Sequence, residues 1–279
     1  MEIQARAKIN WTLDVVGGRP DGYHLLDMLM QPLALQDTLR IEPSSGLSLR
    51  IEGADGLSSD ENNLVLRAAK ALRDTAGITP GAAITLVKQI PMGAGLGGGS
   101  ADAAAALKGL NSFWHIGFDL DQLCKIGVKL GADVPFCLHD APRRAQGIGE
   151  ILSPIESRIF PLVLIQPCEA LSTKEVFAAY HSADIPSPDT KRAASALAQG
   201  NLRALKAAAG NVLESASIPL RPQIAESKTA LYETGAAFSQ MTGSGSVVFG
   251  AYETDKAADR AFKILKNQYP VCIRTSTAL

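Results

Sequence analysis

The most informative stretch of the chain reads Pro91-Met92-Gly93-Ala94-Gly95-Leu96-Gly97-Gly98-Gly99-Ser100-Ala101-Asp102. Five of the seven residues from 93 to 99 are glycine. Glycine loses much conformational freedom on folding, so such a run is favoured where backbone N–H groups must approach a ligand without Cβ atoms in the way. An alternating apolar segment, 83–90, precedes the run and predicts a strand. An alanine-rich segment, 100–113, follows it and predicts a helix with Ser100 as N-cap.

A strand, a glycine-rich turn and a helix N-terminus together indicate a phosphate-binding loop, because the first N–H groups of a helix are unpaired and carry partial positive charge. The alternative is a flexible surface hairpin. Gly93, Gly95 and Gly98 also satisfy the dinucleotide pattern G-x-G-x-x-G, but the next predicted element is a second helix, 120–130, and not a strand that ends in an acid. No lysine follows the glycines as it would in a Walker A loop. A lysine for the phosphates must therefore come from elsewhere.

The remaining elements of the N-terminal half follow from hydrophobic periodicity. Residues 3–16 read as strand, and residues 37–42 and 47–52 read as a hairpin. Apolar residues at helical spacing predict a helix over 63–76, and a short apolar run predicts a strand over 134–138.

The C-terminal half changes pattern after Ser153-Pro154. Strands are predicted at 162–166, 238–241, 247–251 and 271–274, and helices at 173–180, 189–199, 202–209, 222–233 and 255–267. When the inserted helices are set aside, the order is β-α-β-β-α-β, which is typical of a ferredoxin-like sheet. The sequence predicts an α+β protein of two domains, residues 1–155 and 156–279.

Composition narrows the possible functions. The 279 residues are 46% hydrophobic and carry a formal net charge of −1, so nucleic acid is not an expected partner. No apolar run reaches the ~20 residues of a membrane span, and no apolar signal segment is seen at the N-terminus, so no membrane partner and a cytoplasmic location are expected. The four cysteines have no pairing spacing and are expected to be reduced, and the four histidines show no metal-ligand spacing. A monomer or a weak homodimer is expected.

The glycine-rich stretch resembles the phosphate loop of the GHMP kinases. Further stretches that match this family are 5–10 (Ala-Arg-Ala-Lys-Ile-Asn), 19–24 (Arg-Pro-Asp-Gly-Tyr-His), 131–136 (Gly-Ala-Asp-Val-Pro-Phe), 147–150 (Gly-Ile-Gly-Glu) and 241–246 (Met-Thr-Gly-Ser-Gly-Ser). The resemblance implies the GHMP kinase fold, with an N-terminal domain like domain 2 of ribosomal protein S5 and a ferredoxin-like C-terminal domain. It also implies an ATP-dependent kinase that phosphorylates a small-molecule alcohol.

The resemblance assigns ATP, the co-substrate, to the glycine-rich loop. The ATP-binding residues that it implies are Pro91, Met92, Gly93, Ala94, Gly95, Leu96, Gly97, Gly98, Gly99, Ser100 and Ala101. Asn63 would lie near the adenine, or would instead cap the helix that follows it. Mg²⁺ is implied by ATP chemistry, and its ligands are left open because the ion usually keeps waters and binds phosphates.

Two residues match the catalytic positions of the family. Asp133 would act as the base toward the acceptor hydroxyl, and Lys8 would supply the cation that the loop lacks. If the two side chains lie within hydrogen-bond reach, Lys8 would keep the carboxylate ionised. The alternatives are a turn aspartate and a lysine whose ammonium group reaches the surface.

The narrower resemblance is to members that phosphorylate the 2-hydroxyl of a cytidine diphosphate-alcohol in the non-mevalonate isoprenoid pathway. It implies that Tyr23 stacks on the cytosine, His24 reads the base edge and Phe177 closes from the opposite face. Further substrate-binding residues would be Ile148 through its backbone, with Asn10 and Thr173. Arg143 and Arg144 depart from the family pattern and read as exposed loop charges or anion contacts. A mevalonate-type, homoserine-type or sugar kinase and a catalytically silent nucleotide-binding regulator remain alternatives.

Overall fold

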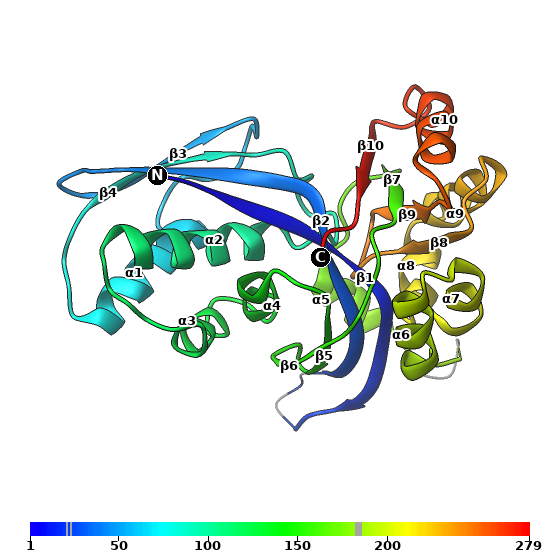
Figure 1. The fold of residues 1–279 in the computed structure, drawn as a ribbon, viewed down its shortest axis with the longest axis horizontal. Helices are drawn as coiled ribbons and strands as arrows, with labels where there is room; N and C mark the ends of the chain where they lie inside the picture. Colours follow the sequence, from blue (N-terminus) through cyan, green and yellow to red (C-terminus); the bar gives the residue numbers. More distant parts are fainter. Residues whose placement is uncertain (21, 23, 182–185) are drawn as a thin grey trace. The chain divides into compact units, whose positions relative to one another are not determined.

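The computed structural model describes residues 1–20, 22, 24–181 and 186–279, and its fold is drawn in Figure 1. These residues form two compact units whose segments alternate along the chain. The first unit comprises Met1–Ala7, Leu35–Ile90 and Gly97–Asp140. The second unit comprises Lys8–Ala34, Pro91–Leu96 and Ala141–Leu279. Residue 155, the predicted boundary between two sequence domains, lies inside the last segment of the second unit. The division into sequence domains at that position stays a prediction.

Two long strands, β1 (Glu2–Gly18) and β2 (His24–Glu42), contribute to both units. In the first unit, β4 (Ala82–Val87) pairs antiparallel with β2 and parallel with β3 (Leu47–Glu52). The predicted hairpin of 37–42 with 47–52 is therefore wrong, because β4 lies between these two strands. A parallel pair needs a long crossover connection, which helix α1 (Leu64–Ala76) supplies between β3 and β4.

Helices of the first unit cover its strands. The helix α2 (Gly98–Phe113) lies beside α1 along one face of the strands, and α3 (Leu120–Gly127) and α4 (Val134–His139) pack against α2 (Figure 1). Five of the nine buried residues of α2 are alanine, a strong helix former. Its buried alanines are Ala101, Ala103, Ala104, Ala105 and Ala106.

The predicted strand at 134–138 is wrong, because these residues form α4. A short apolar run does not distinguish a strand from a buried helix by periodicity. Pro135 in the first turn has a backbone angle suited to a helix start. Asp140 ends the helix in the left-handed conformation, at φ 51°.

The second unit contains a four-stranded antiparallel sheet that confirms the predicted ferredoxin-like order. Its strands are β7 (Pro161–Gln166), β8 (Phe238–Met241), β9 (Val248–Ala251) and β10 (Val271–Ser276), arranged β10-β7-β9-β8. Helix α9 (Gln223–Glu233) packs on β8 and β9, and α10 (Asp255–Leu265) packs on β7 and β10 (Figure 1).

The second unit also holds elements outside this sheet. They are β5 (Arg143–Gly147), β6 (Ile151–Pro154), α5 (Thr173–Ala179), α6 (Thr190–Gln199), α7 (Leu202–Ala208) and α8 (Glu214–Leu220). The short helix α8 was not predicted, and Pro219 inside it weakens any helical pattern. β5 pairs with β2, so Arg143 and Arg144 lie in a strand and not in an exposed loop. Trp11 of β1 is fully buried, with its ring 5.3 Å from the rings of Phe160 and Phe249.

Candidate active site

The first part of the glycine-rich loop, Pro91–Leu96, is fixed through its carbonyl groups. The Leu96 carbonyl accepts a hydrogen bond from the Lys8 N–H at 3.0 Å, and the Ala94 carbonyl accepts one from the Val247 N–H at 3.3 Å. Between them, the Gly95 carbonyl accepts from Thr242 Oγ1 at 3.3 Å. Three consecutive carbonyls are thus used within the second unit, which holds this segment in one conformation.

Gly95 is required by geometry. Its φ is +74°, a conformation that only glycine adopts readily, and a Cβ atom there would lie 2.2 Å from the Thr242 carbonyl oxygen. Gly93 has φ +61°, and its Cβ would lie 2.5 Å from Cβ of Ala170. The glycines therefore permit a close approach of two backbone segments, as expected for a loop that is not a flexible hairpin.

The second part of the loop begins helix α2. Gly97 is the N-cap, with φ +71° and no side-chain capping bond, so the helix starts at Gly98 and the prediction of Ser100 as N-cap is wrong. Gly97 reaches this left-handed conformation because it has no Cβ atom. Because glycine has no side chain that could cap the helix, the first N–H groups of α2 are suited to bind an anion. The hydroxyl of Ser100 lies 3.6 Å from the position of a Gly131 Cβ, near the segment that carries Asp133.

Lys8 is buried, at 4% relative exposure, so the surface-lysine alternative is wrong. Its Nζ donates a hydrogen bond to Asn10 Oδ1 at 2.8 Å. The same oxygen accepts from the Gly243 N–H at 3.1 Å and from Thr242 Oγ1 at 3.3 Å. Asn10 thereby connects Lys8 to the second glycine-rich segment, 241–246. Substrate contact by Asn10 stays a prediction.

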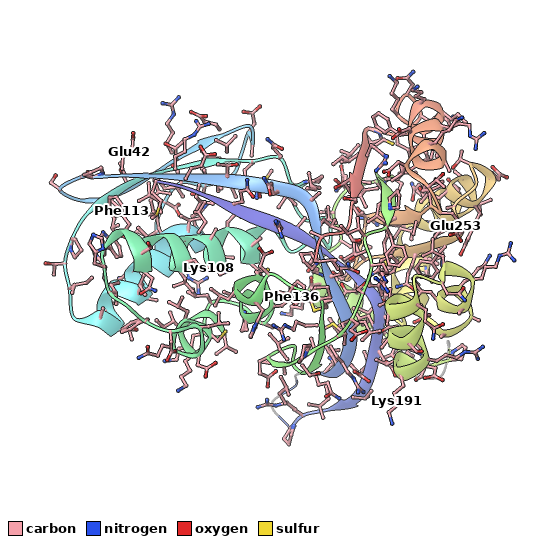
Figure 2. The ribbon with its side chains drawn as sticks, viewed as in Figure 1. Glu42, Lys108, Phe113, Phe136, Lys191 and Glu253 are labelled. Atoms are coloured by element: carbon pink, nitrogen blue, oxygen red, sulfur yellow. The ribbon has the colours of Figure 1, made fainter. Side chains whose placement is uncertain are left out.

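Asp133 occupies the N-cap position of α4, yet its side chain makes no capping hydrogen bond. Aspartate at this position usually accepts a backbone N–H of the first turn. Figure 2 labels Phe136 on the same helix, and this side chain is buried. The buried residues of α4 anchor the helix, and the Asp133 side chain does not cap it.

The structure brings together two of the predicted substrate-binding residues. The rings of His24, at the start of β2, and Phe177, in α5, stack with centroids 4.8 Å apart and planes at 26°. Thr173, the first residue of α5, shares a hydrogen bond with Ser244 at 2.9 Å. Tyr23 lies outside the described residues.

The turn at 147–150 is closed by its own glutamate. The Ile148 N–H donates to Glu150 Oε2 at 2.6 Å, so this N–H has a partner within the protein. Upstream, Arg144 binds Asp27 with two hydrogen bonds of 2.7 Å. This bidentate pair joins β5, which leads into the turn, to β2, which begins with His24. The Nε atom of Arg143 is buried, and no described residue hydrogen-bonds to it.

Asn63 is the N-cap of α1, as one of its two interpretations predicted. Its Oδ1 accepts from the Val65 N–H at 2.9 Å, and its Nδ2 donates to the Ser58 carbonyl at 2.8 Å. The capping role is confirmed. Contact with adenine stays a prediction.

A buried charge cluster of Lys88, Asp37 and Asp102 was not predicted. Lys88 follows β4 at a position that continues its inward-facing residues Ala82, Ile84 and Leu86. A charged residue on the inward face of a strand indicates a buried ion pair, so this alternation could have pointed to Lys88. The sequence does not say which residues pair with it.

Comparison with known proteins identifies the class of this chain. The family described as "GHMP kinases N terminal domain" matches residues 63–141, and "GHMP kinases C terminal" matches residues 193–271. The chain belongs to the GHMP kinase family and is an ATP-dependent small-molecule kinase.

The names of similar proteins describe a narrower activity. "4-diphosphocytidyl-2-C-methyl-D-erythritol kinase" of Pelotomaculum thermopropionicum is 46% identical over 254 residues, 88% of this chain and 87% of that protein. The protein of the same name from Alkaliphilus metalliredigens is 40% identical and covers 96% of this chain and 94% of its own. A crystal structure of 4-(cytidine 5'-diphospho)-2C-methyl-D-erythritol kinase superposes over all of both chains with a TM-score of 0.87 and 35% identity. A homoserine kinase of Cytophaga hutchinsonii, at 18% identity and a TM-score of 0.74, shares the fold.

Proposed function

We propose that this kinase transfers the γ-phosphoryl group of ATP to the 2-hydroxyl of 4-diphosphocytidyl-2-C-methyl-D-erythritol, a step in the non-mevalonate route to isoprenoid precursors. The observation that carries the proposal is the 40–46% identity, over 88–96% of the chain, to proteins named for this kinase activity. The stacked His24–Phe177 pair supports it, because a cytosine needs aromatic surface that mevalonate or homoserine does not.

In this proposal the glycine-rich loop holds the triphosphate. Backbone N–H groups of 97–100 at the start of α2 face the phosphates, since a helix N-terminus favours anions. The carbonyl bonds of 94–96 keep the preceding residues in place. The remaining loop residues, with Asn63 near the base, complete the predicted ATP site.

Asp133 and Lys8 act on the acceptor hydroxyl. As the acceptor oxygen forms its bond to the γ-phosphorus, the bond to the β–γ bridging oxygen breaks and ADP leaves. The hydroxyl proton passes to the Asp133 carboxylate. The Lys8 ammonium, fixed by Asn10, offsets the negative charge of the transferring group.

Mg²⁺ would enter with ATP. The described residues contain no group of three or more His, Cys, Asp or Glu side chains placed to hold a metal. This fits an ion whose ligands are mainly phosphate oxygens and water. When bound, it would neutralise charge on the β- and γ-phosphates, and the Ser100 hydroxyl would be the protein ligand in this scheme.

The proposal also covers the location, oligomeric state and partners of the enzyme. Among the described residues no helix is both long and apolar enough to cross a bilayer. We propose a cytoplasmic enzyme, monomeric or weakly dimeric, that binds no nucleic acid.

A direct assay tests the reaction. Purified protein is incubated with ATP-Mg²⁺ and, separately, with the cytidylyl methylerythritol, mevalonate and homoserine, and ADP release is measured. We expect turnover with the first acceptor only. Preference for another alcohol would contradict the assigned substrate, and no turnover with any of them would indicate a silent nucleotide-binding protein.

The same assay tests the catalytic pair. Asp133→Asn should lower turnover by about two to four orders of magnitude, as for loss of a catalytic base, and Lys8→Met should lower kcat. The control is Asp74→Asn, at an exposed position of α1, which should keep full activity. Normal turnover of Asp133→Asn would remove Asp133 from the mechanism, and a change in KM alone would make Lys8 a binding residue only.

A further variant tests the base site. Phe177→Ala removes the ring that stacks on His24, and should weaken the cytidylyl substrate by about 1–3 kcal/mol, the usual value of one stacked base. KM values for both substrates are measured, and that for ATP should stay unchanged. An increase for ATP alone would mean that the two ends of the site have been assigned in the wrong order, and an equal increase for both substrates would mean that Phe177 is not specific to the cytidylyl end.

A further inference from the structure

The charge cluster of Lys88, Asp37 and Asp102 has no part in the proposed mechanism. Lys88 Nζ hydrogen-bonds to Asp37 Oδ2 and, at 2.8 Å, to Asp102 Oδ2. The three side chains are 5%, 0% and 4% exposed. Removing three charges from water is unfavourable, and replacing such groups by apolar residues is often neutral for stability. A cluster of this kind therefore calls for a reason other than stability.

The cluster contacts the chain on both sides of the glycine-rich loop, and this position suggests its role. Asp37 Oδ1 accepts the N–H groups of Gln89 at 2.5 Å and Ile90 at 2.8 Å, the two residues just before the glycine-rich loop. Asp102 lies in the first two turns of α2, just after the loop. Lys88 bonds to both carboxylates, so one ammonium group connects the residues that enter the loop to those that leave it.

Gly98 lies directly against this cluster. A Cβ atom at Gly98 would be 3.3 Å from Lys88 Nζ and 3.1 Å from Cγ2 of Ile90. The first turn of α2 thus packs on the ammonium group and on the residue before the loop. A shift of either carboxylate would move the backbone N–H groups that start the helix.

One carboxylate oxygen of the cluster has no hydrogen-bond donor among the described residues. Oδ1 of Asp102 is buried, and no described residue hydrogen-bonds to it. Burial raises the pKa of Asp102 to about 7; Lys88 opposes the shift and Asp37 adds to it. Lys88 and Asp37 are the two ionisable groups that act on it. Burial of the second carboxylate is thus unfavourable, and its one hydrogen-bonded oxygen is the one that binds Lys88.

We propose that the Lys88–Asp37–Asp102 cluster is a positioning device that holds the two ends of the glycine-rich loop at the spacing needed for nucleotide binding. The inference rests on the proposed ATP site at that loop. Asp102 is a positioning residue here, because it acts through Lys88 and the backbone and not by contact with the nucleotide.

Binding of ATP-Mg²⁺ to the full chain without acceptor tests the proposal by isothermal titration calorimetry. Asp102→Ala removes the acceptor for Lys88 and should raise the Kd for ATP about tenfold, the loss expected for one charge-assisted hydrogen bond. Asp102→Asn keeps an oxygen at the same place and should stay within about threefold of wild type. Asp102→Ser, whose shorter side chain does not reach Lys88, serves as the second truncating variant if Asp102→Ala does not fold.

The control for general loss of stability is Leu72→Ala, in the fully buried core of α1. It should lower the Tm as much as the cluster variants or more, and leave the Kd for ATP unchanged. Steady-state KM for the acceptor should be unaltered in every variant. An unchanged Kd in Asp102→Ala or Asp102→Ser, or an equal rise in Leu72→Ala, would overturn the proposal. Failure of wild type to turn over the cytidylyl substrate while it binds ATP would count against the proposed acceptor and not against the cluster.

Discussion

The two glycine-rich segments of this kinase have similar composition and opposite surroundings. In residues 93–99, Gly93 and Gly99 are exposed, and the buried side chains of Ala94 and Leu96 anchor the backbone between them. In residues 241–246 every residue is buried. The hydroxyl groups of this second segment bond within the protein, for example Ser246 Oγ to the Cys168 carbonyl at 3.1 Å. The first segment thus combines exposed glycines with the closely packed Gly95, whereas the second segment is closely packed throughout.

The difference shows that a glycine-rich motif has no single meaning. The two segments lead into different elements, because the first continues into α2 and the second continues into the buried strand β9. A helix start offers N–H groups to an anion. The second segment instead supports Asn10, and through it the buried Lys8.

The largest effect is expected where the two segments touch. Gly95→Ala would place a Cβ atom 2.2 Å from the Thr242 carbonyl oxygen at φ +74°, and should lower the free energy of unfolding by roughly 3 kcal/mol or more. Gly56→Ala is the control, because φ there is +80° but no atom lies within 4 Å of the new Cβ. It should lose only about 1 kcal/mol. Thermal denaturation compares them, and equal losses would show that the contact between the segments is unimportant.

A smaller effect is expected for the residue that connects the second segment to Lys8. Asn10→Ala removes an acceptor of three hydrogen bonds, and should cost about 1–3 kcal/mol of stability and lower kcat about tenfold. Asn201→Ala, which removes the N-cap of α7, should cost about 1 kcal/mol with kcat unchanged. If both variants kept full kcat, Asn10 would have only a structural role.

The third effect concerns pH and the buried charge beside the first segment. The pKa of Asp102, beside the first segment, is raised from 3.8 to about 7, mainly by burial. The folded protein then binds a proton that the unfolded chain has released, so this group makes stability fall as pH rises from about 4 to 7. The slope is at most about 1.4 kcal/mol per pH unit.

Urea denaturation of wild type and Asp102→Asn at pH 5 and pH 7.5 measures this contribution as a difference. The variant should lose less stability than wild type over that interval. The same pH dependence in both proteins would show that Asp102 stays ionised when folded.

Much of the fold was predictable because the hydrophobic periodicity of each segment indicates its secondary structure without reference to distant residues. The β-α-β-β-α-β order of the second unit came from periodicity alone, and the observed sheet order β10-β7-β9-β8 agrees with it. The hairpin at 37–52 failed because strand pairing depends on β4, some 30 residues later. Residues 134–138 failed because a short apolar run fits either structure.

The site residues stay predictions, although the structure brings two of them together. Resemblance selected both His24 and Phe177, which the structure stacks, although they lie more than 150 residues apart in sequence. The cluster at Lys88 was missed because its partners are 51 and 14 residues away and no local pattern joins them. Alternation gives the direction of a side chain and not the identity of its neighbour.

The alanine face of α2 affects the thermodynamics of nucleotide binding. Alanine has no side-chain rotamers, so packing this helix removes no rotamer freedom from Ala101 or Ala103–Ala106. Its N-terminus is therefore in place before a ligand arrives. A helix that is ordered in advance adds little conformational entropy cost to association, which leaves more of the interaction energy as measured affinity.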